Sequence, residues 1–433
     1  MPELKKDLTL YGLTMVAIGS CIGSGIFLTP AQIAEQLPSP ILILLVWAIG
    51  GLMAISGALT FAELGARYPQ AGGIYAFLRE AYGDVVGFMY GWATFLVVNT
   101  GAIAALSLAF ASYLAFIIPM DETLKKIVAI AAIISVTLFN IYSVKMGELF
   151  SNVFTGLKLI GIAAIILIGL FLGSADTNDF SMSTVESDFS VTAIGLALIG
   201  VIFSYGGFQH ASFLAGEAKN ARRNIPRSMV IGSSVVCIVY LLTNLAYLYL
   251  LPVAELTQSE DVAARAITSV YPGAGVFIAL IIAISCLGTA GIYTLTSPRI
   301  YFAMASDRIF FAQLAKIHPT YKTPVNAIVS QSVWAIVLVL FWGTFADLIV
   351  YVLFTDWIFL TMAAISIFIF RFNKQEESSY KAFGYPLTPI VFIGLSLFLV
   401  INTLIEKPEQ AGAGLLFLVI GLPVYIFFKR RTS

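Results

Sequence analysis

Residues 19–27 read Gly-Ser-Cys-Ile-Gly-Ser-Gly-Ile-Phe, inside an apolar run that covers about residues 9–36. A second run, about residues 190–215, is interrupted in the same way by Ile-Phe-Ser-Tyr-Gly-Gly-Phe-Gln-His at 202–210. Glycine costs about 1 kcal/mol in a helix interior relative to alanine, so clustered glycines weaken a helix where they fall. Each stretch places its clustered glycines about 15 residues, or ~22 Å of helix, into its run. We therefore predict that both helices break near their middles.

The rest of the chain indicates a membrane protein. Hydrophobic residues make up 59% of the 433 residues and charged residues 11%, and the mean hydropathy is +0.93. A soluble domain needs more polar cover than this, and 24 basic against 24 acidic residues give none of the positive excess of a nucleic-acid binder. Twelve apolar runs are long enough to span a bilayer. They cover about 9–36, 41–66, 84–118, 124–144, 149–173, 190–215, 226–251, 273–303, 325–343, 345–370, 386–405 and 411–428. The sequence predicts an all-α integral membrane protein whose residues 1–433 form a single transmembrane domain.

The basic residues predict the orientation of these spans. With the N-terminus placed in the cytoplasm, most of the 24 Lys and Arg residues fall in cytoplasmic segments. The outer segments then hold only Lys125, Lys126, Arg265 and Lys407. Positive charge concentrates on the cytoplasmic side of membrane proteins, so both termini are expected there.

Sequence motifs for catalysis are missing. The chain contains no Gly-Lys dipeptide, and therefore no phosphate-binding P-loop, and it has no nucleophile elbow. Its two histidines, His210 and His318, lie far apart in sequence, and Cys21, Cys237 and Cys286 fall inside spans. We expect no enzyme activity, no cofactor and no metal. We favour a transporter over an ion channel, because a channel would need a ring of charged side chains or backbone carbonyls.

The two interrupted spans also predict the architecture. They come first in two successive blocks of five spans, and an odd number of spans inverts the second block relative to the first. The expected repeats cover about residues 9–173 and 190–371, with two further helices at about 386–428. Paired glycines can also serve close helix packing, which is the favoured explanation for Gly50, Gly51 and Gly57 in span two.

Broken helices at mid-membrane predict a site built from backbone groups. The second half of span one would begin with free amides, whereas the first halves of spans one and six would end with free carbonyls. A zwitterion complements amides that face carbonyls, and no acidic residue lies in the middle of spans one, three, six or eight. A neutral amino acid is therefore the expected ligand. The candidate substrate-binding residues are Ser20, Cys21, Ile22, Gly23, Ser24, Gly25, Ile202, Phe203, Ser204 and Gly206.

Several motifs resemble the amino acid–polyamine–organocation superfamily. They are Gly-Ser-Gly-Ile-Phe-Leu-Thr-Pro at 23–30, Ala-Glu-Leu-Gly at 62–65, Pro-Gln-Ala-Gly-Gly-Ile-Tyr at 69–75, Phe-Ser-Tyr-Gly-Gly-Phe at 203–208, Gly-Glu-Ala-Lys-Asn at 216–220 and Ile-Pro-Arg at 225–227. Within this superfamily the chain is most similar to the L-type amino acid transporters, especially the bacterial serine/threonine or alanine/serine/cysteine exchangers.

This resemblance implies a leucine-transporter-like fold of five plus five helices in a bacterial cell membrane. It also implies sodium-independent antiport of neutral L-amino acids, particularly small ones such as Ala, Ser, Thr and Cys, with Phe203 as an aromatic gate. Animal members bind a glycoprotein heavy chain through a cysteine in the loop after helix three. Residues 119–123 contain no cysteine here, so no disulfide-linked heavy chain is expected.

Two ionisable residues lie deep within spans. Lys158 is nine residues into span five, where a charge costs about 2.5–3.5 kcal/mol on insertion scales. The resemblance places Lys158 where sodium-coupled relatives hold sodium, between helix one and helix eight, with Ser285 or Thr289 as acceptors. Alternatives are that Lys158 snorkels to the cytoplasm, or that Lys158 or Asp356 titrates in a proton-coupled symporter. His210 is expected to be an interior residue with a satisfied hydrogen bond.

Overall fold

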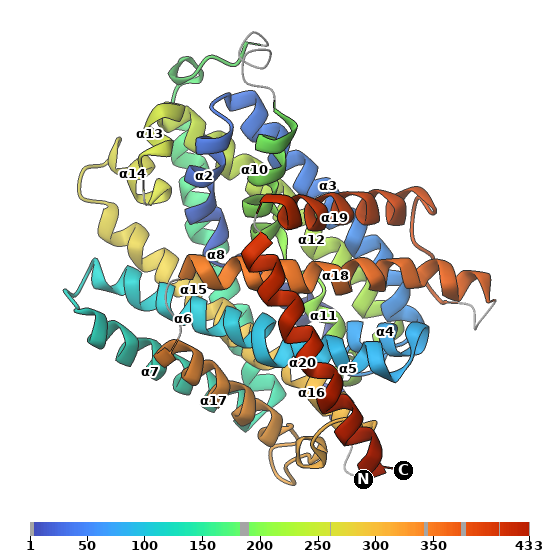
Figure 1. The fold of residues 1–433 in the computed structure, drawn as a ribbon. Coiled ribbons are helices and arrows are strands. Elements are labelled where there is room, and N and C mark those ends of the chain that lie inside the picture. The colour runs from blue at the N-terminus through green and yellow to red at the C-terminus, as the bar shows by residue number, and fades with distance from the viewer. Residues whose placement is uncertain are drawn as a thin grey trace.

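The computed structural model describes residues 4–181, 190–259, 261–341, 345–373, 378–406 and 408–432. Within these ranges the regular structure is helical, and β pairing is limited to one isolated parallel bridge between Leu8 and Ala218. The helices pack in one bundle, and both chain ends lie at the lower edge of the view in Figure 1.

Helices occupy each of the twelve apolar runs. The first five runs contain α1 (Leu10–Cys21) with α2 (Gly25–Gln36), α3 (Pro40–Arg67), α5 (Asp84–Ala93) with η1 (Thr94–Val98) and α6 (Asn99–Ala115), α7 (Glu122–Tyr142), and α8 (Val144–Leu172). The next five contain α10 (Val191–Tyr205) with α11 (His210–Phe213), α12 (Ala221–Leu250), α15 (Gly275–Thr296) with α16 (Pro298–Ser306), α17 (Val325–Phe341), and α18 (Phe345–Phe372). The last two contain α19 (Leu387–Glu406) and α20 (Pro408–Thr432).

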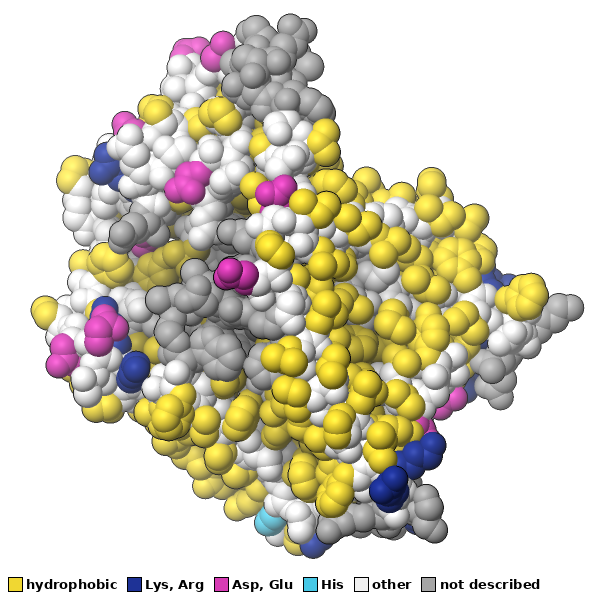
Figure 2. All heavy atoms as spheres, in the orientation of Figure 1, with side chains coloured by type: hydrophobic (Ala, Val, Ile, Leu, Met, Phe, Trp, Pro, Cys, Tyr) yellow, Lys and Arg dark blue, Asp and Glu magenta, His cyan; other side chains and the backbone are white. Residues whose placement is uncertain are grey.

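Many of these helices suit a membrane. Among the described residues, 9 helical stretches are long and apolar enough to cross a bilayer, and α10 and α17 are shorter apolar helices. Large apolar side chains face outward, such as Ile160 and Phe171, which are 69% and 79% exposed. Figure 2 shows a broad apolar surface on this face, with several acidic side chains to its upper left and basic side chains at its lower right. The all-helical membrane fold is therefore confirmed.

Both interrupted spans are broken. α1 ends at Cys21 and α2 begins at Gly25, whereas α10 ends at Tyr205 and α11 begins only at His210. The two breaks touch, because Ser20 Oγ donates a hydrogen bond of 2.8 Å to the Gly207 carbonyl. Gly207 has a φ of +126°, and a Cβ on it would lie 2.5 Å from Ser20 O. Only glycine fits this crossing without strain.

The glycines of span two have the packing role that was expected. A Cβ on Gly50 would lie 2.3 Å from a Val201 side-chain atom, and one on Gly57 would lie 2.5 Å from Phe392. α3 therefore approaches α10 and α19 closely through these glycines.

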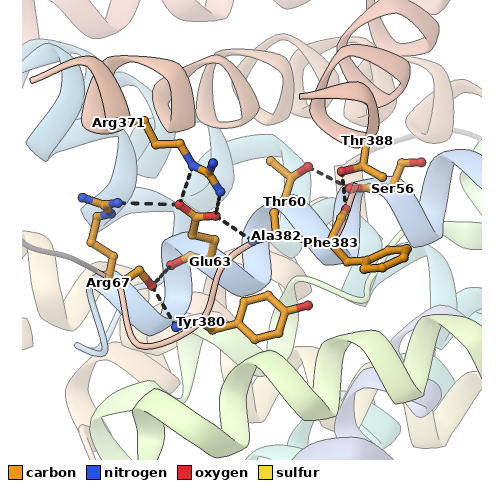
Figure 3. Close-up of polar contacts among 10 residues, drawn as sticks. Ser56, Thr60, Glu63, Arg67, Arg371, Tyr380, Ala382, Phe383 and Thr388 are labelled. Atoms are coloured by element: carbon orange, nitrogen blue, oxygen red, sulfur yellow. Dashed lines mark hydrogen bonds and ion pairs between the residues drawn. The ribbon is translucent and has the colours of Figure 1, made fainter. Parts of the chain in front are cut away.

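Glu63, near the end of α3, is the centre of a second buried polar region (Figure 3). Its side chain is 1% exposed, and its carboxylate accepts hydrogen bonds from Arg371 at the end of α18, with Nε 2.9 Å from Oε1. The Ala382 amide donates to Oε2 at 2.7 Å, and Arg67 lies 3.6 Å from Oε1. Ser378 Oγ donates to the Glu63 carbonyl at 3.3 Å. We call these five residues the Glu63 cluster; it joins α3, α18 and the segment before α19.

Candidate binding site at the two helix breaks

A small cavity lies where the two breaks meet. Its volume is about 50 Å³, which on this measure is room for about three to four water molecules. Among the described residues, none of those that line the cavity is charged. The lining residues are Ser20, Cys21, Gly23, Ser24, Gly25, Gly101, Ala102, Ala105, Leu106, Phe203, Gly206, Thr289 and Tyr293.

The start of α2 supplies hydrogen-bond donors to this cavity. Ser24 precedes α2 and its side chain makes no capping bond. Among the described residues, no backbone acceptor pairs with the amides of Ser24 and Gly25. The Ser24 hydroxyl is buried and also has no partner within the described ranges. An uncapped helix start has a partial positive charge, so these groups suit a carboxylate.

The carbonyl groups are less free than the sequence predicted. Tyr240 OH, from α12, lies 2.9 Å from Cys21 O and 3.0 Å from Ser204 O, so its proton is shared between the two breaks. The Ile202 carbonyl accepts the Gly206 amide at 2.9 Å. Ile22, Ile202 and Ser204 do not line the cavity, although they were predicted to contact a ligand. The protein itself uses these acceptors to hold the broken ends in place.

Lys158 is bound inside the protein. It is fully buried, and its Nζ donates to Gly19 O at 2.9 Å, to Ile22 O at 2.7 Å and to Thr289 Oγ1 at 2.6 Å. These three acceptors match the three protons of an ammonium group. The carbonyls at the end of α1 also carry the negative end of the helix dipole. Lys158 therefore joins α8, α1 and α15, and the snorkelling alternative is wrong.

The two expected partners of Lys158 have different contacts. Thr289 accepts from Lys158 and lines the cavity as well. Ser285 has no hydrogen bond to Lys158; its Oγ donates to Gly23 O at 2.9 Å. Ser285 thus holds the same broken end of α1 from α15 without contacting the ammonium.

Phe203 and several unpredicted residues form the walls of the cavity. Phe203 is half-buried at the end of α10. α6 contributes Gly101, Ala102, Ala105 and Leu106. In the sequence, these residues cannot be distinguished from other small and apolar residues at a helix interface. Tyr293 follows Thr289 by four residues, a spacing that places both side chains on one face of α15. This spacing could have identified Tyr293 as a lining residue from the sequence.

His210 and Asp356 lie outside this cavity lining. His210 Nδ1 and Thr296 Oγ1 are 2.7 Å apart, so His210 is an interior residue with a hydrogen-bond partner, as expected. Its ring packs against Tyr293, with centroids 4.1 Å apart. Asp356 lies in α18 and does not line the cavity.

Comparison with known proteins points to one family. Residues 8–428 match the family model for amino acid permeases. The chain is 34% identical to the serine/threonine exchanger SteT of Bacillus subtilis, over 99% of this chain and 98% of SteT. It is 31% identical to the b(0,+)-type amino acid transporter 1 of Mus musculus, over 98% and 88% of the two chains. It is 28% identical to the human cystine/glutamate transporter, over 98% and 86%.

These matches extend over nearly the whole chain, including both broken helices. They agree with a membrane-spanning helical fold whose cavity is formed by backbone amides, hydroxyls and apolar side chains. The chain therefore belongs to the amino acid permease family, in the amino acid–polyamine–organocation superfamily, and it is an amino acid transporter and not an enzyme.

Proposed function

We propose that this transporter exchanges small neutral L-amino acids across the cell membrane by sodium-independent alternating access. The observation that carries the proposal is the uncharged cavity at the uncapped start of α2. A substrate carboxylate would bind the amides of Ser24 and Gly25 and the free Ser24 hydroxyl. Its ammonium would face the carbonyl groups of the lining residues Ser20, Phe203 and Gly206, which come from the ends of α1 and α10. A charged side chain would find no ionic partner among the residues that line the cavity.

Cavity size supports a small side chain. A cavity with room for about three to four water molecules, bounded by Leu106, Phe203 and Tyr293, leaves little room beyond the amino acid backbone. The exchanger from Bacillus subtilis is named for serine and threonine, which are of this size. Phe203 would move to admit the substrate and return to cover it.

Lys158 supports independence from sodium. Its ammonium makes contacts with two carbonyls and a hydroxyl that would otherwise suit a bound cation. A permanent charge at this position would tie α1 to α15 with no ion from solution. Lys158 and Thr289, together with Ser285 on the neighbouring carbonyl, would then set the equilibrium between the open and closed forms of the site.

The proposed arrangement in the membrane has twelve spans and cytoplasmic termini. Two inverted repeats, about residues 9–173 and 190–371, would place the two broken helices at equivalent positions, with the last two helices outside the repeats. Cys21, Cys237 and Cys286 all lie in helices, so we propose that the transporter works without a disulfide-linked heavy chain. The similarity to the exchanger from Bacillus subtilis supports a bacterial cell membrane.

A proton-coupled symporter is the second candidate. Lys158 favours it, because within the described residues this buried ammonium has no carboxylate in contact. Such a group can bind and release a proton as the site opens. Asp356 is the other candidate for the titrating group.

Uptake by proteoliposomes separates the two candidates. Radiolabelled serine would be offered to vesicles that are empty or preloaded with serine, in sodium or potassium buffer, with and without a pH gradient. Exchange predicts uptake only into preloaded vesicles and no effect of sodium. Equal uptake into empty vesicles would refute exchange, and dependence on the pH gradient would support symport. Competition by unlabelled alanine, leucine, lysine and glutamate would test the proposed size and charge of the substrate.

A further inference from the structure

We propose that a groove lined by Lys6, Arg222 and Arg223 binds a phosphate group, supplied either by an anionic phospholipid or by free phosphate. The groove has a volume of about 680 Å³ and is separate from the cavity at the helix breaks. Its other lining residues are small or neutral: Pro69, Ala215, Ala218, Asn220 and Ala221. Among the residues that the structure describes, no acidic residue lines it.

Backbone pairing brings the three basic residues together from distant parts of the sequence. The Leu8 amide donates to Glu217 O at 3.0 Å, and the Lys219 amide donates to Leu8 O at 2.9 Å. This pairing fixes the segment before α1 beside the segment before α12, and so places Lys6 on the same groove as Arg222 and Arg223.

The start of α12 adds backbone donors to the groove. Asn220 precedes this 30-residue helix with a φ of +47° and makes no side-chain capping bond. Asn220 O accepts the amides of Arg223 and Asn224, whereas no backbone acceptor within the described ranges pairs with the amides of Ala221 and Arg222. Two uncapped amides and three cations on one groove form a strong site for an oxyanion.

Nearby carboxylates are engaged elsewhere. Asp7 pairs with Lys5 at 2.8 Å, and this contact lowers the pKa of Asp7. Glu217 is buried against Arg299, with Oε2 2.8 Å from Nε and Oε1 2.9 Å from Nη2. In the part of the chain that the structure describes, no carboxylate lies within 4.0 Å of Lys6, Arg222 or Arg223. Within the described ranges, no carboxylate therefore neutralises the positive charge of the groove.

The proposed orientation of the protein in the membrane favours a lipid headgroup as the source of the phosphate group. Free phosphate can also reach the groove. The groove lies at the cytoplasmic ends of α1 and α12 in that orientation, where the headgroups of anionic lipids concentrate. A bound phosphate would bridge Lys6, which precedes the broken span, to α12.

Thermal unfolding of the full-length protein in detergent tests the proposal. The unfolding midpoint would be recorded against increasing phosphatidylglycerol in mixed micelles, with phosphatidylcholine as the neutral lipid. A second series would add sodium phosphate, compared with sodium chloride at equal ionic strength. The test variant is K6Q/R222Q/R223Q. The matched control is R227Q/K316Q/K381Q, which removes three exposed charges from segments expected on the same side.

The proposal predicts that phosphatidylglycerol or phosphate raises the midpoint of the wild type and of the control. Half-saturation in the test variant should need at least about tenfold more ligand, because charge-assisted hydrogen bonds are lost. Stabilisation by the lipid alone would identify a headgroup, and stabilisation by sodium phosphate as well would identify a general phosphate site. No stabilisation of the wild type, or equal losses in both variants, would overturn the proposal. Unchanged serine exchange would confirm that both variants are folded.

Discussion

The helix-break cavity and the Glu63 cluster are both buried and polar, yet they differ in how completely their polar groups are paired. In the Glu63 cluster, both carboxylate oxygens accept hydrogen bonds, and the donors come from two other segments, Arg371 in α18 and the Ala382 amide before α19. At the cavity, the Ser24 hydroxyl and two neighbouring amides have no partner among the described residues.

This difference separates structure from function. A buried carboxylate that already has all its hydrogen-bond partners needs no ligand. Removing one partner of such an ion pair leaves the other as an unpaired buried charge. Unpaired buried donors cost free energy unless a ligand completes them. We therefore interpret the Glu63 cluster as a structural clamp and the cavity as the place where a substrate supplies the missing partners. Five substitutions test this distinction.

Glu63→Ala should cause the largest effect, a loss of about 3 kcal/mol of stability, because Arg371 and Arg67 lose their buried partner. The thermal unfolding midpoint in detergent would report it. Glu80→Ala, at an exposed position, is the control and should change little. A midpoint for Glu63→Ala that equals that of the control would show that the cluster does not clamp the fold.

Gly25→Val should weaken substrate binding by about a hundredfold or more. A Cβ at Gly25 would lie 2.5 Å from Ser204 Oγ and 2.9 Å from Ser204 Cα, so the valine would force α2 away from α10. Stabilisation of the protein against heat by added serine would measure the affinity. Wild-type affinity in this variant would show that the break in span one does not form the site.

Lys158→Ala should slow exchange by about tenfold or more while leaving expression intact. The substitution removes the cost of inserting a charge into the membrane, so expression should not suffer. It also removes the hydrogen bonds that hold α1 to α15. A change of about 1.4 kcal/mol shifts the equilibrium between the open and closed forms tenfold. Exchange would be measured in proteoliposomes between pH 5 and 9, with Lys316→Ala as an exposed control. In a symporter, the variant would instead keep exchange and lose its pH dependence. Wild-type exchange at every pH would remove both roles of Lys158.

Gly23→Ala sharpens the test of the cavity. Its Cβ would lie 3.4 Å from Leu106 and 3.6 Å from Thr289, which are ordinary contacts, so the fold should tolerate it. The added methyl group would nevertheless enter the cavity beside the free amides. We expect about tenfold weaker serine binding with an unchanged unfolding midpoint. Unweakened binding would place the substrate elsewhere.

Phe203→Ala should have the smallest effect, a several-fold slower exchange in a stable protein, because the ring would cover the substrate only when the site closes. Phe171→Ala, on the exposed surface of α8, is the control. If exchange is equally fast in both variants, Phe203 is not a gate.

Local patterns in the sequence were sufficient to predict much of the fold. Continuous apolar runs identified the helices, because hydropathy and helix geometry depend on neighbouring residues. The glycine clusters located both breaks, and the depth of Lys158 in its span indicated a buried charge. Thr289 was recognised as its partner only through the family resemblance.

Contacts between distant segments could not be predicted. Tyr240 holds Cys21 and Ser204 from α12, and Arg371 reaches Glu63 across 308 positions of sequence. Nothing local distinguishes these residues from others of their type. The same holds for the walls contributed by α6, whose small residues fit any apolar helix interface.

The sequence by itself determined which segments are helices, where two of them break and that the break region has no acidic side chain. Only the tertiary structure decided which of the exposed backbone groups stay available. Ile22 O binds Lys158, Ser204 O accepts from Tyr240, and the amides of Ser24 and Gly25 remain open to the cavity. The reason is physical. A glycine cluster frees backbone donors and acceptors wherever it breaks a helix, but the helices packed around the break determine which of them are satisfied within the protein.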